Sequence, residues 1–161
     1  MNELILSLYS AIRSGETSEV KAIILDTPSL INTTDERGFT PLIMAAYFNR
    51  LEIVRFLIEN GARINDVDGA GNTALMGAVF KGFSEVAEYL LSKGASVYTR
   101  NFNGANVMTY AAGFGTAEII DMLVEAQADA TLKDNKGMSA IDYAKKQGNT
   151  AFLEALGETT N

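Results

Sequence analysis

The chain has 161 residues and a formal net charge of −7, because 20 acidic residues outnumber 13 basic ones. A hydrophobic share of 47% with 20% charged residues is typical of a folded globular protein and argues against disorder. The absence of His and Cys excludes Ser-His-Asp triads, thiolate nucleophiles, disulfides and the usual zinc sites. We therefore expect no catalytic residue, no metal and no cofactor, and the acidic charge disfavours nonspecific binding to nucleic acid or anionic membranes.

The first 14 residues show no sign of a targeting segment. They lack a basic start, and their apolar residues are spaced for one face of a helix instead of forming a continuous stretch. No part of the sequence approaches the length of a membrane-spanning helix. We expect a cytoplasmic, monomeric protein with no membrane partner.

From residue 35 onward the sequence repeats itself every 33 residues without an insertion. A repeat of this length indicates one supersecondary unit used several times. Acidic or amide residues open the units at Asp35, Asp68, Asn101 and Asp134. Other aligned positions hold Gly38, Gly71, Gly104 and Gly137; Leu42, Leu75, Met108 and Ile141; and Ala45, Ala78, Ala111 and Ala144.

Each unit predicts two helices joined by a turn. Helix N-cap residues, whose side chains accept from free backbone N–H groups, recur at Thr40, Thr73, Asn106 and Ser139. Pro41 follows the first of these at a position where its fixed φ suits a helix. A second, more apolar helix over residues 51–58 ends at Gly61, and the next unit ends its second helix at Gly94. We expect both glycines to adopt the left-handed conformation that closes a helix.

This pattern resembles the ankyrin repeat family. The resemblance is carried by Asp35-x-x-Gly38-x-Thr40-Pro41-Leu42, by Ala45-Ala46, by Leu51-Glu52-Ile53-Val54 and by Gly61-Ala62. It implies an all-α solenoid of about five 33-residue helix-turn-helix repeats, with short β-hairpin-like loops that project at right angles. Residues 1–161 are expected to form a single domain, with capping repeats at 1–34 and 134–161 and internal repeats at 35–67, 68–100 and 101–133.

The chain departs from the family pattern at several positions, and the places of the family's His and of one closing Gly are two of them. The family's His is replaced in every unit, by Ile43, Met76, Thr109 and Asp142. Gln127 stands where the earlier units have Gly61 and Gly94. If Gln127 adopts a positive φ, a strain of roughly 1 kcal/mol follows. Our hypothesis is that the repeat over residues 101–133 is locally the least stable.

The resemblance also implies which residues face a partner. They are the second, third, fifth, thirteenth, fourteenth and last of each unit, and they include six bases, six aromatic residues and one acid, Glu36. A basic, aromatic concave groove is thus predicted on an acidic body, and aromatics with Arg are typical of binding hot spots. The candidate partner-binding residues are Arg37, Phe39, Tyr47, Phe48, Phe80, Lys81, Arg100, Phe102, Phe114, Lys133, Lys136 and Lys146.

We therefore interpret the chain as a non-catalytic module that binds a protein with an acidic surface, as an inhibitor, an immunity-type protein or a regulator. One alternative is nucleic-acid or phosphate binding through the basic groove. Another is an enzyme that uses carboxylate and Lys chemistry near Asp142, Tyr143 and Lys145. Asp142 and Lys145 are three residues apart on one helix face, so a surface ion pair is the preferred interpretation.

A calcium loop is also rejected. Asp66 and Asp68 are spaced like the first ligands of such a loop. The fifth and twelfth places, which require oxygen ligands, hold Ala70 and Gly77. This segment is therefore interpreted as a hairpin between repeats.

Overall fold

The computed structural model describes residues 3–158, and within that range it contains helices and turns but no strand. Five helix pairs follow one another: α1 (Glu3–Ser14) with α2 (Thr17–Asp26), α3 (Pro41–Tyr47) with α4 (Leu51–Glu59), α5 (Ala74–Lys81) with α6 (Ser84–Ser92), α7 (Val107–Phe114) with α8 (Ala117–Glu125), and α9 (Ala140–Gln147) with α10 (Thr150–Ala155). A short 3-10 helix, Pro28–Asn32, follows α2. Residues 1–2 and 159–161 of the two predicted capping repeats lie outside the described range.

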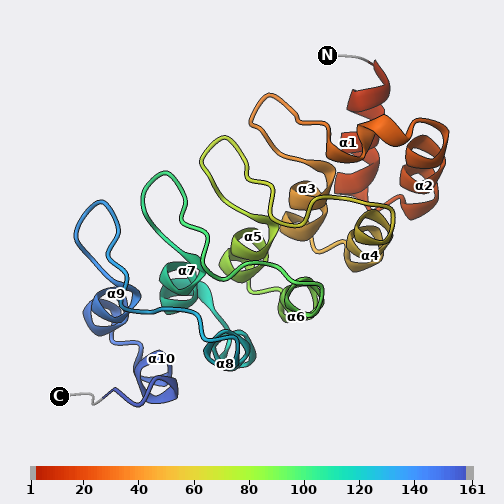
Figure 1. The fold of residues 1–161 in the computed structure, drawn as a ribbon. Helices are drawn as coiled ribbons and strands as arrows, with labels where there is room; N and C mark the ends of the chain where they lie inside the picture. Colours follow the sequence, from red (N-terminus) through yellow and green to blue (C-terminus); the bar gives the residue numbers. More distant parts are fainter. Residues whose placement is uncertain (1–2, 159–161) are drawn as a thin grey trace.

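The helix pairs stack side by side into two rows (Figure 1). The inner row runs α1, α3, α5, α7, α9 and the outer row α2, α4, α6, α8, α10, with each helix packed against the next in its row. Long loops extend from the inner row on one side, and the two ends of the chain lie at opposite ends of the stack (Figure 1). The predicted all-α solenoid is therefore confirmed.

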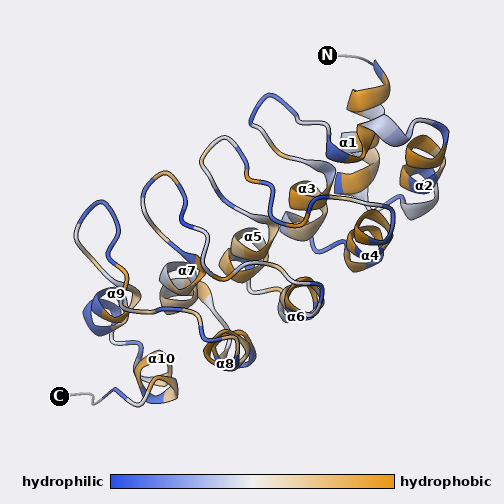
Figure 2. Cartoon of the chain, viewed as in Figure 1, coloured by the Kyte–Doolittle hydropathy of each residue, from blue (hydrophilic) through white to orange (hydrophobic). Residues whose placement is uncertain are grey.

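Small side chains let the inner helices approach closely. Ala45, Ala78, Ala111 and Ala144 are fully buried, each on an inner helix. Larger apolar residues seal the outer row, where Leu57, Leu90 and Leu123 are also fully buried. Hydrophobic residues accordingly concentrate on the helices, whereas the loops carry more hydrophilic ones (Figure 2). One continuous core thus connects all the repeats.

The predicted helix boundaries are confirmed. The N-cap side chains of Thr40, Thr73, Asn106 and Ser139 each accept a hydrogen bond from the backbone N–H three residues on. Gly61 and Gly94 have φ values of 97° and 87° and close α4 and α6. Two of the four residues that replace the family His, Thr109 and Asp142, have side chains that accept a hydrogen bond from the N-cap backbone N–H. Each thereby completes a capping box.

The projecting loops are tight turns held by the residue that opens each unit. The Asp68 carboxylate, for example, accepts from the backbone N–H groups of Ala70 and Asn72 at 2.8 and 2.9 Å. Each loop also bonds to the next, as where the N–H of Gly69 donates to the carbonyl of Arg37 at 2.8 Å. Gly38 is required there, because a Cβ would lie 2.6 Å from the Gly69 nitrogen. The loops therefore form one connected rim beside the inner helices.

Gln127 closes α8 with a φ of 58°, in the left-handed region that its glycine counterparts occupy. The condition on which the expected strain depends is therefore met. The reduced stability expected for its repeat stays a prediction.

Candidate protein-binding groove

Aromatic side chains from three consecutive units meet on the face between the inner helices and the loop rim. The Tyr47 ring has its centroid 6.1 Å from that of Phe39, 5.6 Å from that of Phe48 and 6.5 Å from that of Phe80. Phe80 continues the contacts to Tyr110 at 6.0 Å and to Phe114 at 4.7 Å. We call Phe39, Tyr47, Phe48, Phe80, Tyr110 and Phe114 the aromatic row.

Two basic side chains lie against this row. The Arg37 guanidinium is 4.6 Å from the centroid of the Phe39 ring, and the Lys81 ammonium is 5.1 Å from that of Tyr47. Both distances permit a cation–π attraction. Arg37 and Lys81 are both exposed and so are accessible to a ligand on the groove, although Arg37 also lies 3.8 Å from the Asp35 carboxylate.

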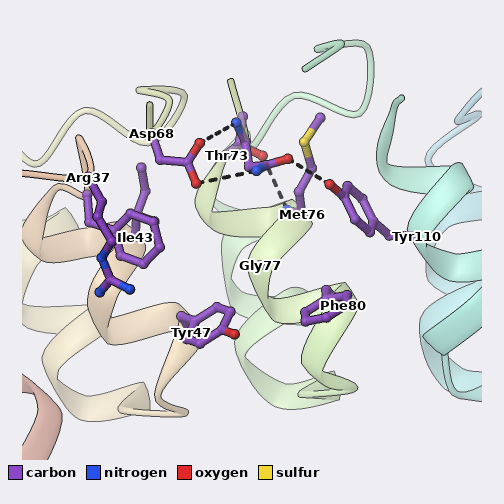
Figure 3. Close-up of a pocket in the computed structure, with 11 residues that line it drawn as sticks. Arg37, Ile43, Tyr47, Asp68, Thr73, Met76, Gly77, Phe80 and Tyr110 are labelled. Carbon is purple, nitrogen blue, oxygen red and sulfur yellow. Dashed lines mark hydrogen bonds between the residues drawn. The ribbon is translucent and has the colours of Figure 1, made fainter. Parts of the chain in front are cut away.

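A pocket of about 290 Å³ opens between α3 and α5, under the loop that begins at Asp68 (Figure 3). Its apolar wall comes from Ile43, Tyr47, Met76 and Phe80, and its floor includes Gly77. Its polar wall comes from Arg37, Asp68, Asn72 and Tyr110. We call this cavity the Gly77 pocket.

Hydrogen bonds fix the polar wall of the Gly77 pocket. The Tyr110 hydroxyl donates to Oδ1 of Asn72 at 2.8 Å, and Nδ2 of Asn101 donates to the same oxygen at 2.9 Å. Burial of the Tyr110 hydroxyl raises its pKa above the ordinary value, so it stays a donor at neutral pH. Asp68 itself is only 9% exposed. This side of the pocket is therefore ordered before any ligand arrives.

Of the predicted site residues, the structure brings together those of the aromatic row and its two bases. These are Arg37, Phe39, Tyr47, Phe48, Phe80, Lys81 and Phe114. Phe48 caps α3 and is half-buried against the core, whereas the ring of Phe114 is 57% exposed.

The remaining predicted residues lie elsewhere on the face. Phe102, Lys133 and Lys136 are exposed on the loop side of the inner row, and Lys146 is exposed on α9. The Arg100 guanidinium donates to the carbonyls of Gly104 and Lys133, and so it ties two loops together. Within residues 3–158 no ring contact, cation–π contact or ion pair joins these five residues to the aromatic row.

The charge of the groove is more mixed than the sequence positions suggest. Carboxylates that open the units lie at the base of the rim: Asp35 is 3.8 Å from the Arg37 guanidinium, and Asp68 lines the pocket. Asp134 accepts from the Tyr143 hydroxyl at 2.6 Å, which holds the pKa of that carboxyl below its usual range. The six predicted bases therefore share the face with four acids, these three and Glu36.

Sequence reasoning missed Tyr110 and Gly77, because it considered only the positions that the family uses toward partners. One aligned position of the inner helices holds Met44, Gly77, Tyr110 and Tyr143. The change in side-chain size along this position was the available signal. A glycine in the middle of a helix has a conformational cost, which calls for a reason in packing or function.

The predicted ion pair between Asp142 and Lys145 is wrong. The Asp142 carboxylate accepts from the backbone N–H and the hydroxyl of Ser139, both at 2.9 Å. Lys145 lies 3.6 Å from the Glu158 carboxylate instead. Among the described residues no group of His, Cys, Asp and Glu could hold a metal ion, and no helix is long and apolar enough to cross a membrane.

Comparison with known proteins places the repeats in a family. The family model for ankyrin repeats, in three copies, matches residues 8–101, more than half of the chain. Over 54 residues the chain is 44% identical to the human DNA-binding protein RFXANK, a match that covers 34% of this chain and 21% of that protein. Over 57 residues it is 35% identical to the NAD-capped RNA hydrolase NUDT12 of Macaca fascicularis, covering 35% of this chain and 12% of the hydrolase.

The chain thus matches about a fifth or less of the length of these relatives. Ankyrin repeats typically bind other proteins and are generally non-catalytic, so they indicate a protein–protein interaction module. The match of the family model, the 33-residue unit and the two stacked helix rows agree, and the chain belongs to the ankyrin repeat family.

Proposed function

We propose that this chain is a non-catalytic module that holds an acidic segment of a partner protein on the groove between the inner helices and the loop rim. The observation that carries the proposal is the aromatic row with Arg37 and Lys81 against it. Phe80 and Phe114 leave 37% and 57% of their surface exposed, beside each other. Exposed aromatic rings with Arg are the composition of interface hot spots.

Electrostatics supports an acidic partner segment. The molecule as a whole has a net charge of −7, whereas the exposed bases Arg37 and Lys81 lie against the aromatic row on the groove. A negatively charged segment would be repelled elsewhere and attracted to Lys81 and Arg37, which steers association to this face. Because four acids lie on the same face, the groove does not present a uniform positive field. The partner segment must therefore match individual charges along the groove.

Those acids also argue against nucleic acid as the ligand. A phosphate backbone presents a regular line of negative charge, which would meet the carboxylates of Asp35 and Asp68 as well as the bases. The relative RFXANK is named a DNA-binding protein, but that name describes the whole of RFXANK, and the matched segment covers only 21% of it. Nucleic-acid binding is therefore kept as an outcome of the test below.

Two lysines make a matched pair for the experiment. Lys81 lies 5.1 Å from the Tyr47 ring centroid on the groove, and Lys93 lies 5.5 Å from that of Tyr89, at the end of an outer helix. Arg100 is a poorer probe, because its guanidinium bonds two loop carbonyls. The partner is first isolated by affinity capture from host lysate, and its dissociation constant is then measured against each variant at several salt concentrations.

We expect Lys81→Glu to weaken partner binding roughly tenfold or more and to flatten its salt dependence, because a groove attraction becomes a repulsion. Lys93→Glu should leave the affinity within about twofold. Equal effects of the two variants would contradict the groove as the binding face. Tight, steeply salt-dependent binding of an oligonucleotide would replace the proposal with its nucleic-acid alternative.

A further inference from the structure

The two repeats that follow Gly77 show which side chain occupies the equivalent space in their own units. Tyr110 and Tyr143 lie 33 and 66 residues after Gly77, at the same position of the inner helix. Each of their hydroxyls bonds to the residue that opens its own unit: Tyr143 donates to Oδ2 of Asp134 at 2.6 Å, and Tyr110 accepts from Nδ2 of Asn101 at 3.0 Å. In both units a phenol ring therefore spans from the inner helix to the base of the loop.

The middle unit has the same scaffold without the ring. Asp68 occupies the place of Asp134, but Gly77 has no side chain to reach it. A Cβ on Gly77 would meet only the Tyr47 ring, at an ordinary contact distance of 3.7 Å. Gly77 is not among the glycines with a positive φ, so the backbone does not require glycine there. The glycine thus leaves open a space that a side chain could occupy.

The walls of the Gly77 pocket match an aromatic ring. Phe80 packs edge-on against Tyr110, and Tyr47, one repeat earlier, faces Gly77 in the corresponding way. Met76 completes the apolar wall (Figure 3). The volume of about 290 Å³ is ample, because a cavity of roughly 150 Å³ already admits benzene.

The polar end of the pocket has capacity for one more hydrogen-bond donor. Oδ1 of Asp68 accepts from two backbone N–H groups, whereas Oδ2 receives a single long bond of 3.3 Å from Nδ2 of Asn72. A carboxylate oxygen can accept two hydrogen bonds. The corresponding oxygen of Asp134 accepts the Tyr143 hydroxyl.

We propose that the Gly77 pocket receives a tyrosine side chain of the partner protein, with its ring against Tyr47 and Met76 and its hydroxyl donating to Oδ2 of Asp68. The inference rests on the proposed protein-binding function. A phenylalanine would fill the apolar wall but offer Oδ2 of the buried Asp68 carboxylate no additional donor, and sites built to bond a hydroxyl discriminate against the analogue that lacks it. A lysine or arginine would enter beside Arg37, which already places a positive charge at the pocket.

The test uses small molecules that reproduce single side chains. p-Cresol stands for tyrosine, toluene for phenylalanine and n-butylammonium for lysine. Binding to the full chain is followed by NMR, through the signals of Gly77 and Met76, two residues that line the pocket. We expect p-cresol to shift these signals with an affinity about tenfold or more above that of toluene, as fits a hydrogen bond to a charged group, and above that of n-butylammonium.

Two variants and a control localise the effect. Gly77→Tyr supplies the missing ring from within the chain and should abolish p-cresol binding, while Glu88→Tyr, at an exposed position of the outer helix α6, should leave it unchanged. Asp68→Asn keeps the loop, because Asn101 makes the same turn with its Oδ1. The introduced amide can still donate to a phenol oxygen, as that of Asn101 does to Tyr110, so the preference for p-cresol over toluene should become smaller without vanishing. Circular dichroism of each variant verifies that the fold is retained.

Several results would overturn the proposal. They are equal affinities for p-cresol and toluene, tighter binding of n-butylammonium, undiminished p-cresol binding to Gly77→Tyr, and no binding to the folded wild type. Because p-cresol is uncharged and requires no partner, its titration reports on the pocket alone. Failure of the groove itself would show separately, in equal partner affinities of the Lys81→Glu and Lys93→Glu variants.

Discussion

Replacing Gln127 with glycine should stabilise the protein through the backbone alone. Gln127 has a φ of 58°, and the left-handed region costs a residue with a Cβ roughly 1–2 kcal/mol relative to glycine's freedom there. Part of this gain is lost, because glycine also gains entropy in the unfolded chain. We therefore expect Gln127→Gly to raise the free energy of unfolding by about 1 kcal/mol, or Tm by roughly 2–4 °C for a chain of this size.

The matched control is the reverse change in the preceding repeat. Gly94 has a φ of 87°, and a Cβ built on it meets no atom within 4 Å, so Gly94→Gln adds strain without a clash. It should lower the free energy of unfolding by about the same amount. Urea unfolding gives the free energy of unfolding of both variants. Native-state hydrogen exchange shows whether Gln127→Gly increases amide protection within residues 101–133 more than in the other repeats. A neutral or destabilising Gln127→Gly would refute the reasoning and, with it, the idea that this residue weakens its repeat.

Two further predictions concern the helices and loops. Thr73→Ala removes the N-cap acceptor of α5, which bonds to the Met76 N–H at 3.2 Å in a buried position, and should cost about 1–2 kcal/mol in urea unfolding. Tyr143→Phe removes the hydrogen bond that lowers the Asp134 pKa, so an NMR titration should show that pKa rising toward its usual value. A carboxyl whose pKa is lowered by folding stabilises the fold at pH values above its unfolded pKa, and this stabilisation disappears as the pH falls through the folded pKa. Tyr143→Phe should therefore have a smaller free energy of unfolding than the wild type at pH 7. The difference between the two should shrink in acid. An unchanged Asp134 titration, or a Thr73→Ala variant as stable as the wild type, would contradict these assignments.

The features that could be predicted from the sequence are those that depend on local chemistry repeated in register. Thr40 and Ser139 cap helices, and Gly61 and Gly94 close them, because each acts within a few residues of itself. The 33-residue spacing then predicts that equivalent helices stack in rows, and this prediction does not depend on which residues are in contact.

The candidate site depended on contacts between repeats, which spacing does not reveal. Arg100 was predicted to face a partner, but its guanidinium finds carbonyl acceptors in its own loop and in the next one. The Gly77 pocket arises from a side chain that is missing in one repeat and present in the next two. Because Gly77 carries no functional group, only the change in side-chain size along its aligned position marks the site in the sequence.

The central claim is that the inner row and the loop rim form the binding face. Hydrogen-exchange mass spectrometry of the complex with its captured partner tests this most directly, because it compares both rows of helices in one experiment. The account predicts new protection in the segments 35–48, 68–81 and 101–114, with little change in α4, α6 and α8. Protection confined to those three outer helices would contradict it.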